Sequence, residues 1–171
     1  MSNSTSTTPT TSPLLETGLQ ALGTARWFTM QLIENIPEDK FFTAPCAGGN
    51  HAGWCAGHIA MTDEHFRTQL GGGDPVFAQE WGKRFNEKCI DDASKYPSKA
   101  ELIEALDKTR EAIIAWVSSL SDEQLLEPIE GDLAKFATSR AHMLGSIAFH
   151  EGVHAGQMST ARRAQGFEPL F

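Results

Sequence analysis

Four long stretches of this 171-residue chain repeat their apolar residues at three- and four-residue steps, with glycine or proline between them. They cover about residues 14–36, 51–70, 98–120 and 139–164. Apolar residues at these steps fall on one face of an α-helix, and Arg26 is the one polar interruption of the first stripe. The period-two alternation of strands continues nowhere for long enough to compete. The pattern predicts an all-α fold, a four-helix bundle.

Polar residues at the starts of these stretches predict where the helices begin. Asn50 is the expected N-cap of the second helix, because its side chain can accept a free backbone N–H of the first turn. Ser98, followed three residues later by Glu101, has the pattern of a capping box for the third helix. Thr138 or Ser139 is the expected cap of the fourth.

The remaining segments are connections and a tail. Residues 76–97 form a long connection between the second and third helices, with a short helical turn expected at 76–85, and such connections often cover sites. A second connection spans 121–137. The Ser-, Thr- and Pro-rich segment 1–13 has nothing to bury and is not a signal peptide, so it is expected to be a disordered tail before one domain at 14–171.

Charge and cysteine content exclude several classes of partner. The net charge is −8 and the 14 basic residues form no run, which argues against nucleic acid and against anionic membranes as partners. No apolar run approaches the roughly 20 residues of a membrane span. Three cysteines, Cys46, Cys55 and Cys89, are odd in number and suit reduced thiols rather than a disulfide framework. A cytoplasmic protein is expected.

The histidines cluster in two short regions of the chain: His51, His58 and His65, then His142, His150 and His154. His150 and His154 are four residues apart on a predicted helix, so both imidazoles lie on one face within reach of a common ion. Three protein ligands would leave one position of a zinc-type ion open. The first three histidines are seven apart on the second helix, and their periodicity does not select the third ligand.

The segment 150–154, His-Glu-Gly-Val-His, also matches the H-E-x-x-H motif of zinc proteases, in which the glutamate is the general base. The flanking sequence disfavours that interpretation. A metzincin would continue with glycine and histidine where this chain has Gln157 and Thr160. A downstream acidic ligand would have to be Glu168, beyond the helix breaker Gly166, and no strand is predicted to bind an extended peptide.

Three segments resemble the DinB-like superfamily. Residues 48–60, from Gly-Gly-Asn-His through Gly-His-Ile-Ala, resemble its second helix, and residues 150–157 resemble its fourth-helix pattern His-x-x-x-His-x-Gly-Gln. Residues 96–102 are similar to other members. The resemblance implies a four-helix bundle in which one histidine of the second helix and two of the fourth bind a divalent metal. Matched by motif, these are His58, His150 and His154.

The resemblance also implies a range of activities. Members bind nickel or zinc and often form dimers, and some transfer bacillithiol or mycothiol. One is a thiol-dependent isomerase, and many have no assigned reaction. We therefore expect a metal-dependent thiol transferase or related enzyme, with a small-molecule substrate, a low-molecular-weight thiol cosubstrate and a homodimeric assembly. The alternatives are a non-catalytic, stress-related metal-binding module and a purely structural bundle without metal.

Four further positions keep two interpretations each. His51 is a candidate acid or base at the pocket mouth, or a first-turn histidine with a structural hydrogen bond. Gln157 is a candidate partner of a ligand histidine or substrate, or a solvated residue. Cys55 is a fourth ligand or a small buried apolar residue. Gly152 weakens its helix by about 1 kcal/mol relative to alanine unless a neighbouring helix approaches closely there.

Overall fold

The computed structural model describes residues 12–77 and 80–170. Within these ranges the regular structure is helical, apart from an isolated bridge between Pro128 and Ser139. Residues 1–11 of the predicted disordered tail lie outside the described residues. The first helix begins at Pro13, one residue before the expected start, and the Ser12 side chain caps it by accepting the Leu14 N–H. No helix of the described chain combines the length and apolar character needed to cross a membrane.

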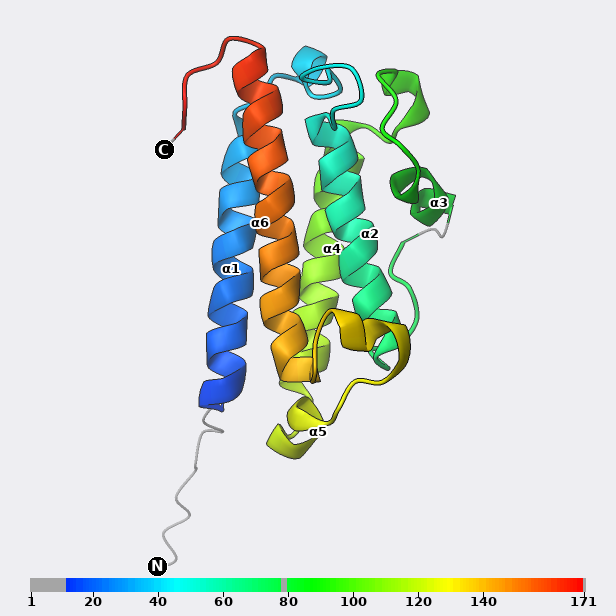
Figure 1. Cartoon of the computed structure of the whole chain (residues 1–171), viewed down its shortest axis with the longest axis vertical. Helices are drawn as coiled ribbons and strands as arrows, with labels where there is room; N and C mark the ends of the chain where they lie inside the picture. The colour runs from blue at the N-terminus through cyan, green and yellow to red at the C-terminus, as the bar shows by residue number, and fades with distance from the viewer. Residues whose placement is uncertain (1–11, 78–79, 171) are drawn as a thin grey trace, which may run out of the picture.

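Four long helices form the predicted bundle: α1 (Pro13–Glu34), α2 (Ala52–Gln69), α4 (Lys99–Ser118) and α6 (Arg140–Ala164) (Figure 1). The helical turn expected at 76–85 is present as α3, which begins later than predicted and spans Glu80–Asn86. The connection 121–137 contains two elements that the sequence pattern did not predict, the short helix α5 (Asp122–Leu126) and a 3-10 helix, η3. The 3-10 helices are η1 (Glu38–Lys40), η2 (Ala93–Lys95) and η3 (Gly131–Lys135).

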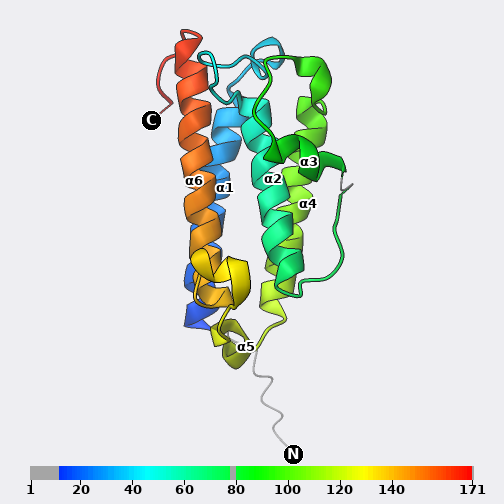
Figure 2. The same ribbon diagram turned by 45° about the vertical axis from the view of Figure 1, so that its right-hand side comes forward.

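The direction of the helices explains the long connection before α4. In Figures 1 and 2, α1 and α6 run in one direction, whereas α2 and α4 run in the other. Helix α1 packs along α6, α2 packs along α4, and α2 and α6 meet as antiparallel neighbours. Because α2 and α4 are parallel, the chain between them must return along the length of the bundle. Helix α3 lies in that return segment and packs against α2.

A buried ionic network joins the four long helices across the core. It consists of Arg26 of α1, Asp63 of α2, Arg110 of α4 and Glu151 of α6, all at most 9% exposed. Arg26 contacts Glu151 at 2.7 Å and Asp63 at 3.2 Å, and Arg110 contacts the same two carboxylates at 2.5 and 2.9 Å. The four formal charges cancel, as charges this deeply buried require. The polar interruption at Arg26 is thus part of the core.

The cap of α2 differs from the prediction. His51, not Asn50, is the N-cap, and its Nδ1 accepts the backbone N–H of Trp54 at 2.9 Å. An imidazole nitrogen here replaces the side-chain oxygen that usually fills this role. The amide of Asn50 instead donates to Gln157 of α6 at 3.0 Å.

The caps of the other two predicted helix starts are confirmed. Ser98 and Glu101 form a complete capping box at the start of α4, each side chain accepting a backbone N–H of the other. Ser139, one of the two candidates, caps α6 by accepting the N–H of His142. These local signals identify helix starts because they satisfy backbone N–H groups that have no partner within the helix.

Candidate metal centre

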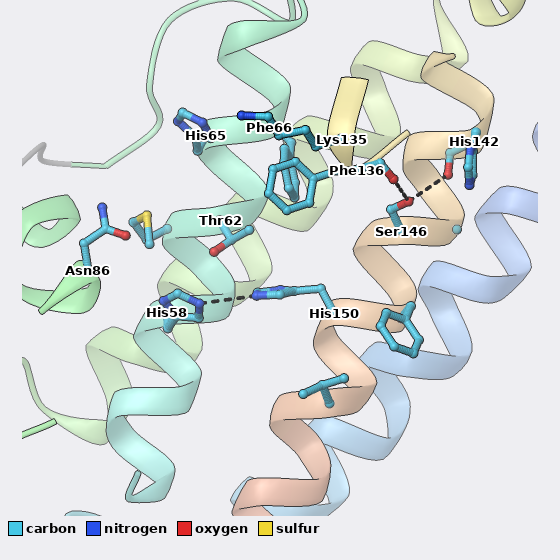
Figure 3. A pocket seen from close by; sticks show the side chains of 14 residues that line it. His58, Thr62, His65, Phe66, Asn86, Lys135, Phe136, His142, Ser146 and His150 are labelled. Atoms are coloured by element: carbon cyan, nitrogen blue, oxygen red, sulfur yellow. Dashed lines mark hydrogen bonds between the residues drawn. The ribbon is translucent and has the colours of Figure 1, made fainter. Parts of the chain in front are cut away.

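His58 of α2 meets His150 and His154 of α6 across the contact between these antiparallel helices. The Nε2 atom of His150 lies 3.3 Å from Nε2 of His58 and 3.1 Å from Nε2 of His154. One ring nitrogen from each of the three residues lies within 4.8 Å of the others. Figure 3 shows His58 and His150 pointing toward each other from the two helices.

This geometry fits a divalent ion held by imidazoles. Two nitrogen ligands at 2.0 to 2.1 Å from a tetrahedral ion lie about 3.3 Å from each other. The observed separations of 3.1 and 3.3 Å are close to that value. Three neutral nitrogen donors suit zinc, nickel or a similar ion, and they would leave its full positive charge at the site.

The protonation state of the histidines also favours metal binding. Burial, with the neighbouring His154 and His58 adding to it, lowers the pKa of His150 to about 4. Burial is likewise the main cause that lowers the pKa of His58 and that of His154. All three rings are therefore neutral at pH 7, and a metal ion need not displace a proton from them.

Hydrogen bonds behind the rings direct the Nε2 lone pairs inward. Nδ1 of His58 donates to the backbone oxygen of Phe85, just before the end of α3, at 2.8 Å. Nδ1 of His154 donates to Oε1 of Gln157 at 3.0 Å. A proton on Nδ1 leaves Nε2 as an acceptor, so these partners fix the tautomer that a metal needs. The Trp54 ring stacks on His58 with centroids 4.6 Å apart and also fixes its orientation.

Gln157 lies at the centre of a small polar cluster behind His154. Its Oε1 accepts hydrogen bonds from His154, from Asn50 at 3.0 Å and from the Cys55 thiol at 3.5 Å. The contact with His154 is the partner role that the sequence suggested for Gln157. The roles of Asn50 and Trp54 were not predicted, although Trp54 lies four residues before His58, a spacing that brings side chains together on a helix.

Cys55 and His51 lie outside the group of converging nitrogens. Cys55 is fully buried, burial raises the pKa of its thiol, and the thiol donates to Gln157, which matches the buried alternative. His51 is also fully buried, and burial lowers its pKa. Its Nδ1 caps α2 and its Nε2 donates to the backbone oxygen of Ile90 at 3.2 Å. Both ring nitrogens thus have structural partners.

A cavity of about 910 Å³ opens beside His58 and His150, between α2 and α6. Its far end is formed by Phe66 of α2 and by Phe136, which follows η3 (Figure 3). Most of its surface is apolar, and none of the described residues that line it is an aspartate or a glutamate. His65 and His142 line the cavity as well, although neither belongs to the converging group.

Glu151 is not available as a general base in this cavity. A residue directly after His150 on a helix points about 100° away from it, from 3.6 residues per turn. The Glu151 side chain is fully buried and bonded to Arg26 and Arg110. The H-E-x-x-H spacing therefore places its two histidines at the site and its glutamate in the core.

Comparison with known proteins agrees with the resemblance found in the sequence. The model of the DinB superfamily matches residues 21–158, most of the chain. The chain belongs to the DinB superfamily. The predicted membership is thereby confirmed, together with the four-helix fold that it implied.

Two solved structures of low sequence identity share the fold of this DinB-superfamily chain. A conserved protein from Enterococcus faecalis is 18% identical, with a TM-score of 0.69, over 89% of this chain and 97% of its own. YfiT from Bacillus subtilis is 17% identical, with a TM-score of 0.67, over 97% of this chain and 96% of its own. YfiT is described as a probable metal-dependent hydrolase with an unusual four-helix bundle topology. Comparison with curated proteins gave no match.

Proposed function

We propose that this chain is a metal-dependent enzyme that transfers a small thiol to an electrophilic substrate, using an ion held by His58, His150 and His154. The observation that carries the proposal is the convergence of three neutral imidazoles beside a cavity without carboxylates among its described lining. When bound, a divalent ion such as zinc or nickel acts as a Lewis acid and lowers the pKa of a coordinating thiol or water.

The chemistry of the lining favours a thiol over water as the nucleophile. Activation of water commonly uses a protein base within hydrogen-bonding distance, and Glu151 is turned into the core. His65 lies seven residues from His58, and His142 lies eight residues from His150. These spacings correspond to about 10 to 12 Å along the helix axes, so neither histidine is within hydrogen-bonding distance of a water on the ion. A thiol needs only a lowered pKa, because the thiolate is itself the nucleophile.

The residues of the site have distinct tasks in this reaction. Phe85 and Gln157 hold the ring orientation of His58 and His154. The apolar cavity holds the electrophile next to the sulfur and keeps water away from it. The thiol sulfur forms a bond to the electrophilic carbon, the leaving group departs with the bonding electrons, and the thiol proton passes to solvent.

An assay with two substrates separates thiol transfer from hydrolysis. Zinc- or nickel-loaded protein is supplied with 1-chloro-2,4-dinitrobenzene and a panel of low-molecular-weight thiols, including bacillithiol and mycothiol. A nitrophenyl ester without thiol is tested beside it. The proposal predicts conjugation that is faster than the uncatalysed reaction and that requires both metal and thiol. In metal-free protein and in His58→Ala, the rate of conjugation should fall to the uncatalysed rate.

Each other outcome selects an alternative. Metal-dependent ester cleavage without conjugation would support the hydrolase description given to YfiT. Metal bound in stoichiometric amount with neither reaction would support a non-catalytic metal-binding module. Conjugation that persists in metal-free protein would exclude the proposed site as its cause.

A further inference from the structure

The formal charge of the described cavity lining is opposite in sign to that of the chain as a whole. The chain carries 22 acidic residues and a net charge of −8. The described lining of the cavity nevertheless includes no acidic residue, and its one Lys or Arg is Lys135. A divalent ion on the three neutral histidines would add two positive charges at the opposite end. A pocket of this kind attracts anions and repels cations.

The residues that line the cavity extend from His58 and His150 to a second group about two turns further along α2. His58 and His150 lie at one end, and His65, Phe66 and Lys135 lie at the other, as Figure 3 shows. Seven residues of α2 separate His58 from His65, which corresponds to about 10 Å along the helix axis. That length matches an extended chain of about eight carbon atoms, from the geometry of single bonds near 1.5 Å.

Aromatic and aliphatic side chains line the cavity between the histidines and its far end and form part of that far end. Phe66 and Phe136 contact each other edge to face with ring centroids 5.6 Å apart, and Met61 lies five residues before Phe66 on α2. Phe149 of α6 borders the cavity with 75% of its surface exposed. An apolar ligand would cover much of this surface, which is otherwise in contact with water.

Lys135 is free to exchange its present partner for a ligand. Its ammonium group lies 2.7 Å from Asp132, in a pair whose side chains are 73% and 94% exposed. A pair so exposed contributes little to stability. Asp132 borders a neighbouring groove rather than this cavity. A ligand anion at the far end would therefore compete for Lys135 at small cost.

From these observations we infer that the cavity binds an apolar acid: a ligand with its reacting group at His58 and His150, a chain or ring along the phenylalanines, and an anionic terminus near Lys135. The inference rests on the proposed function for the reacting end and names the class of substrate that the site accepts.

Thiols that differ only at the far end test this assignment. 8-Mercaptooctanoate, 1-octanethiol and 8-amino-1-octanethiol are titrated into cobalt-loaded protein, with 3-mercaptopropionate as the short acid. Calorimetry measures each affinity. Separately, the sulfur-to-cobalt absorption band reports whether the sulfur reaches the ion. The variants are Lys135→Met and Phe149→Ala, both at exposed positions.

The inference predicts that, among the eight-carbon thiols, the one with a terminal carboxylate binds most tightly, the one with a terminal methyl group binds less tightly, and the one with a terminal ammonium group binds least tightly. Lys135→Met should weaken 8-mercaptooctanoate about three- to fivefold, the range expected for an exposed charge pair, and leave octanethiol unchanged. Phe149→Ala should weaken both eight-carbon thiols. 3-Mercaptopropionate, too short to span the cavity, should respond to neither variant.

The two readouts separate failure of the inference from failure of the proposed function. Equal affinity for the acid and the neutral thiol, or an equal effect of Lys135→Met on both, would overturn the inference even if the cobalt band is present. The predicted order of affinity without a cobalt band would uphold the apolar-acid site and contradict thiol activation at the metal.

Discussion

The amide oxygen of Gln157 accepts three hydrogen bonds and connects the candidate metal centre to the start of α2. One donor is His154, and the other two, Asn50 and Cys55, belong to the segment that leads into or forms that helix. This oxygen keeps the proton of His154 on Nδ1 and its lone pair on Nε2. Partners of this kind are typically worth 10- to 100-fold in metal affinity.

Gln157→Leu should therefore lower zinc affinity by about 10- to 100-fold while leaving the helix intact. Gln20→Leu, at an exposed position of α1, is the control for exchange of an amide for an apolar side chain. Competition with a chromophoric chelator measures both affinities. Equal affinity of the two variants would mean that Gln157 does not position His154.

The low pKa of His150 has a consequence for the stability of the metal-free protein. The pKa is about 4 in the folded chain, because of burial and then His154 and His58, and about 6.5 for a histidine in an unfolded chain. Between these values the unfolded chain binds a proton that the folded chain does not. The free energy of unfolding should therefore fall as the pH drops from about 6.5 to about 4.

Thermal unfolding of metal-free protein at about pH 7.5 and about pH 5 measures this loss. His150→Gln removes the titrating group and should show a smaller decrease in melting temperature between the two pH values. His142→Gln, which removes an exposed imidazole elsewhere on α6, is the matched control. An unchanged decrease in His150→Gln would assign the pH dependence to other groups.

At the scale of single residues, the sequence pattern predicts a metal site but does not identify all three ligands. Spacing identifies His150 and His154, and only the family resemblance selects His58. The structure gives the physical reason why the other two histidines of this segment do not join the group. His51 is buried and caps α2, and His65 is exposed two turns after His58 on α2. Capping and burial depend on tertiary neighbours, which periodicity does not describe.

At the scale of elements, the four long helices are joined by the buried charges of Arg26, Asp63, Arg110 and Glu151. Glu151→Gln should destabilise the protein by about 3 to 5 kcal/mol, because two buried guanidinium groups would then share one carboxylate. Below its unfolding transition the variant should still bind one metal ion, since Glu151 is not at the site. Denaturant unfolding and metal titration measure the two effects.

Glu104→Gln is the matched control for that substitution. Glu104 forms an exposed pair with Lys108 at 2.6 Å on the surface of α4, and its loss should change stability by less than about 1 kcal/mol. Equal effects of the two substitutions would contradict a structural role for the network. Loss of metal from folded Glu151→Gln would show that the geometry of the three histidines depends on the buried network.

Two helix glycines should respond to alanine in opposite directions. A Cβ at Gly57 would overlap the ring of Phe85, whose backbone oxygen also accepts the hydrogen bond of His58. Gly57→Ala should therefore cost about 1 to 3 kcal/mol and weaken metal binding as α3 shifts. A Cβ at Gly152 would meet nothing within 4 Å, so Gly152→Ala should gain up to about 1 kcal/mol.

Thermal melts and metal titration of the two variants check this pair. A Gly57→Ala variant as stable as the wild type would show that the contact between α3 and α2 does not depend on Gly57. Among the residues that the structure describes, no neighbour makes the close helix approach considered for Gly152. The sequence alone does not reveal which helix glycines face a neighbouring side chain, because a glycine that faces a neighbour and one that faces open space look the same in the sequence pattern.

For the whole molecule, the class of fold is predictable and the helix directions are not. Four periodic stretches indicate a bundle, but periodicity is the same whichever way a helix runs. The long segment before α4 was the available signal, because a parallel pair such as α2 and α4 needs a connection that spans the bundle (Figure 1). The buried ionic network was likewise unpredictable. In the sequence Arg26 only interrupts the apolar face of the first helix, and its partners on the other helices are known only from the structure.

The most direct test of a metal centre at His58, His150 and His154 is elemental analysis of untagged protein beside His58→Ala and His150→Ala. The account predicts about one divalent ion per chain in the wild type, lost in both variants while their helical circular dichroism is retained. Wild-type protein that holds no ion after refolding with zinc or nickel, or variants that keep a full complement, would contradict it.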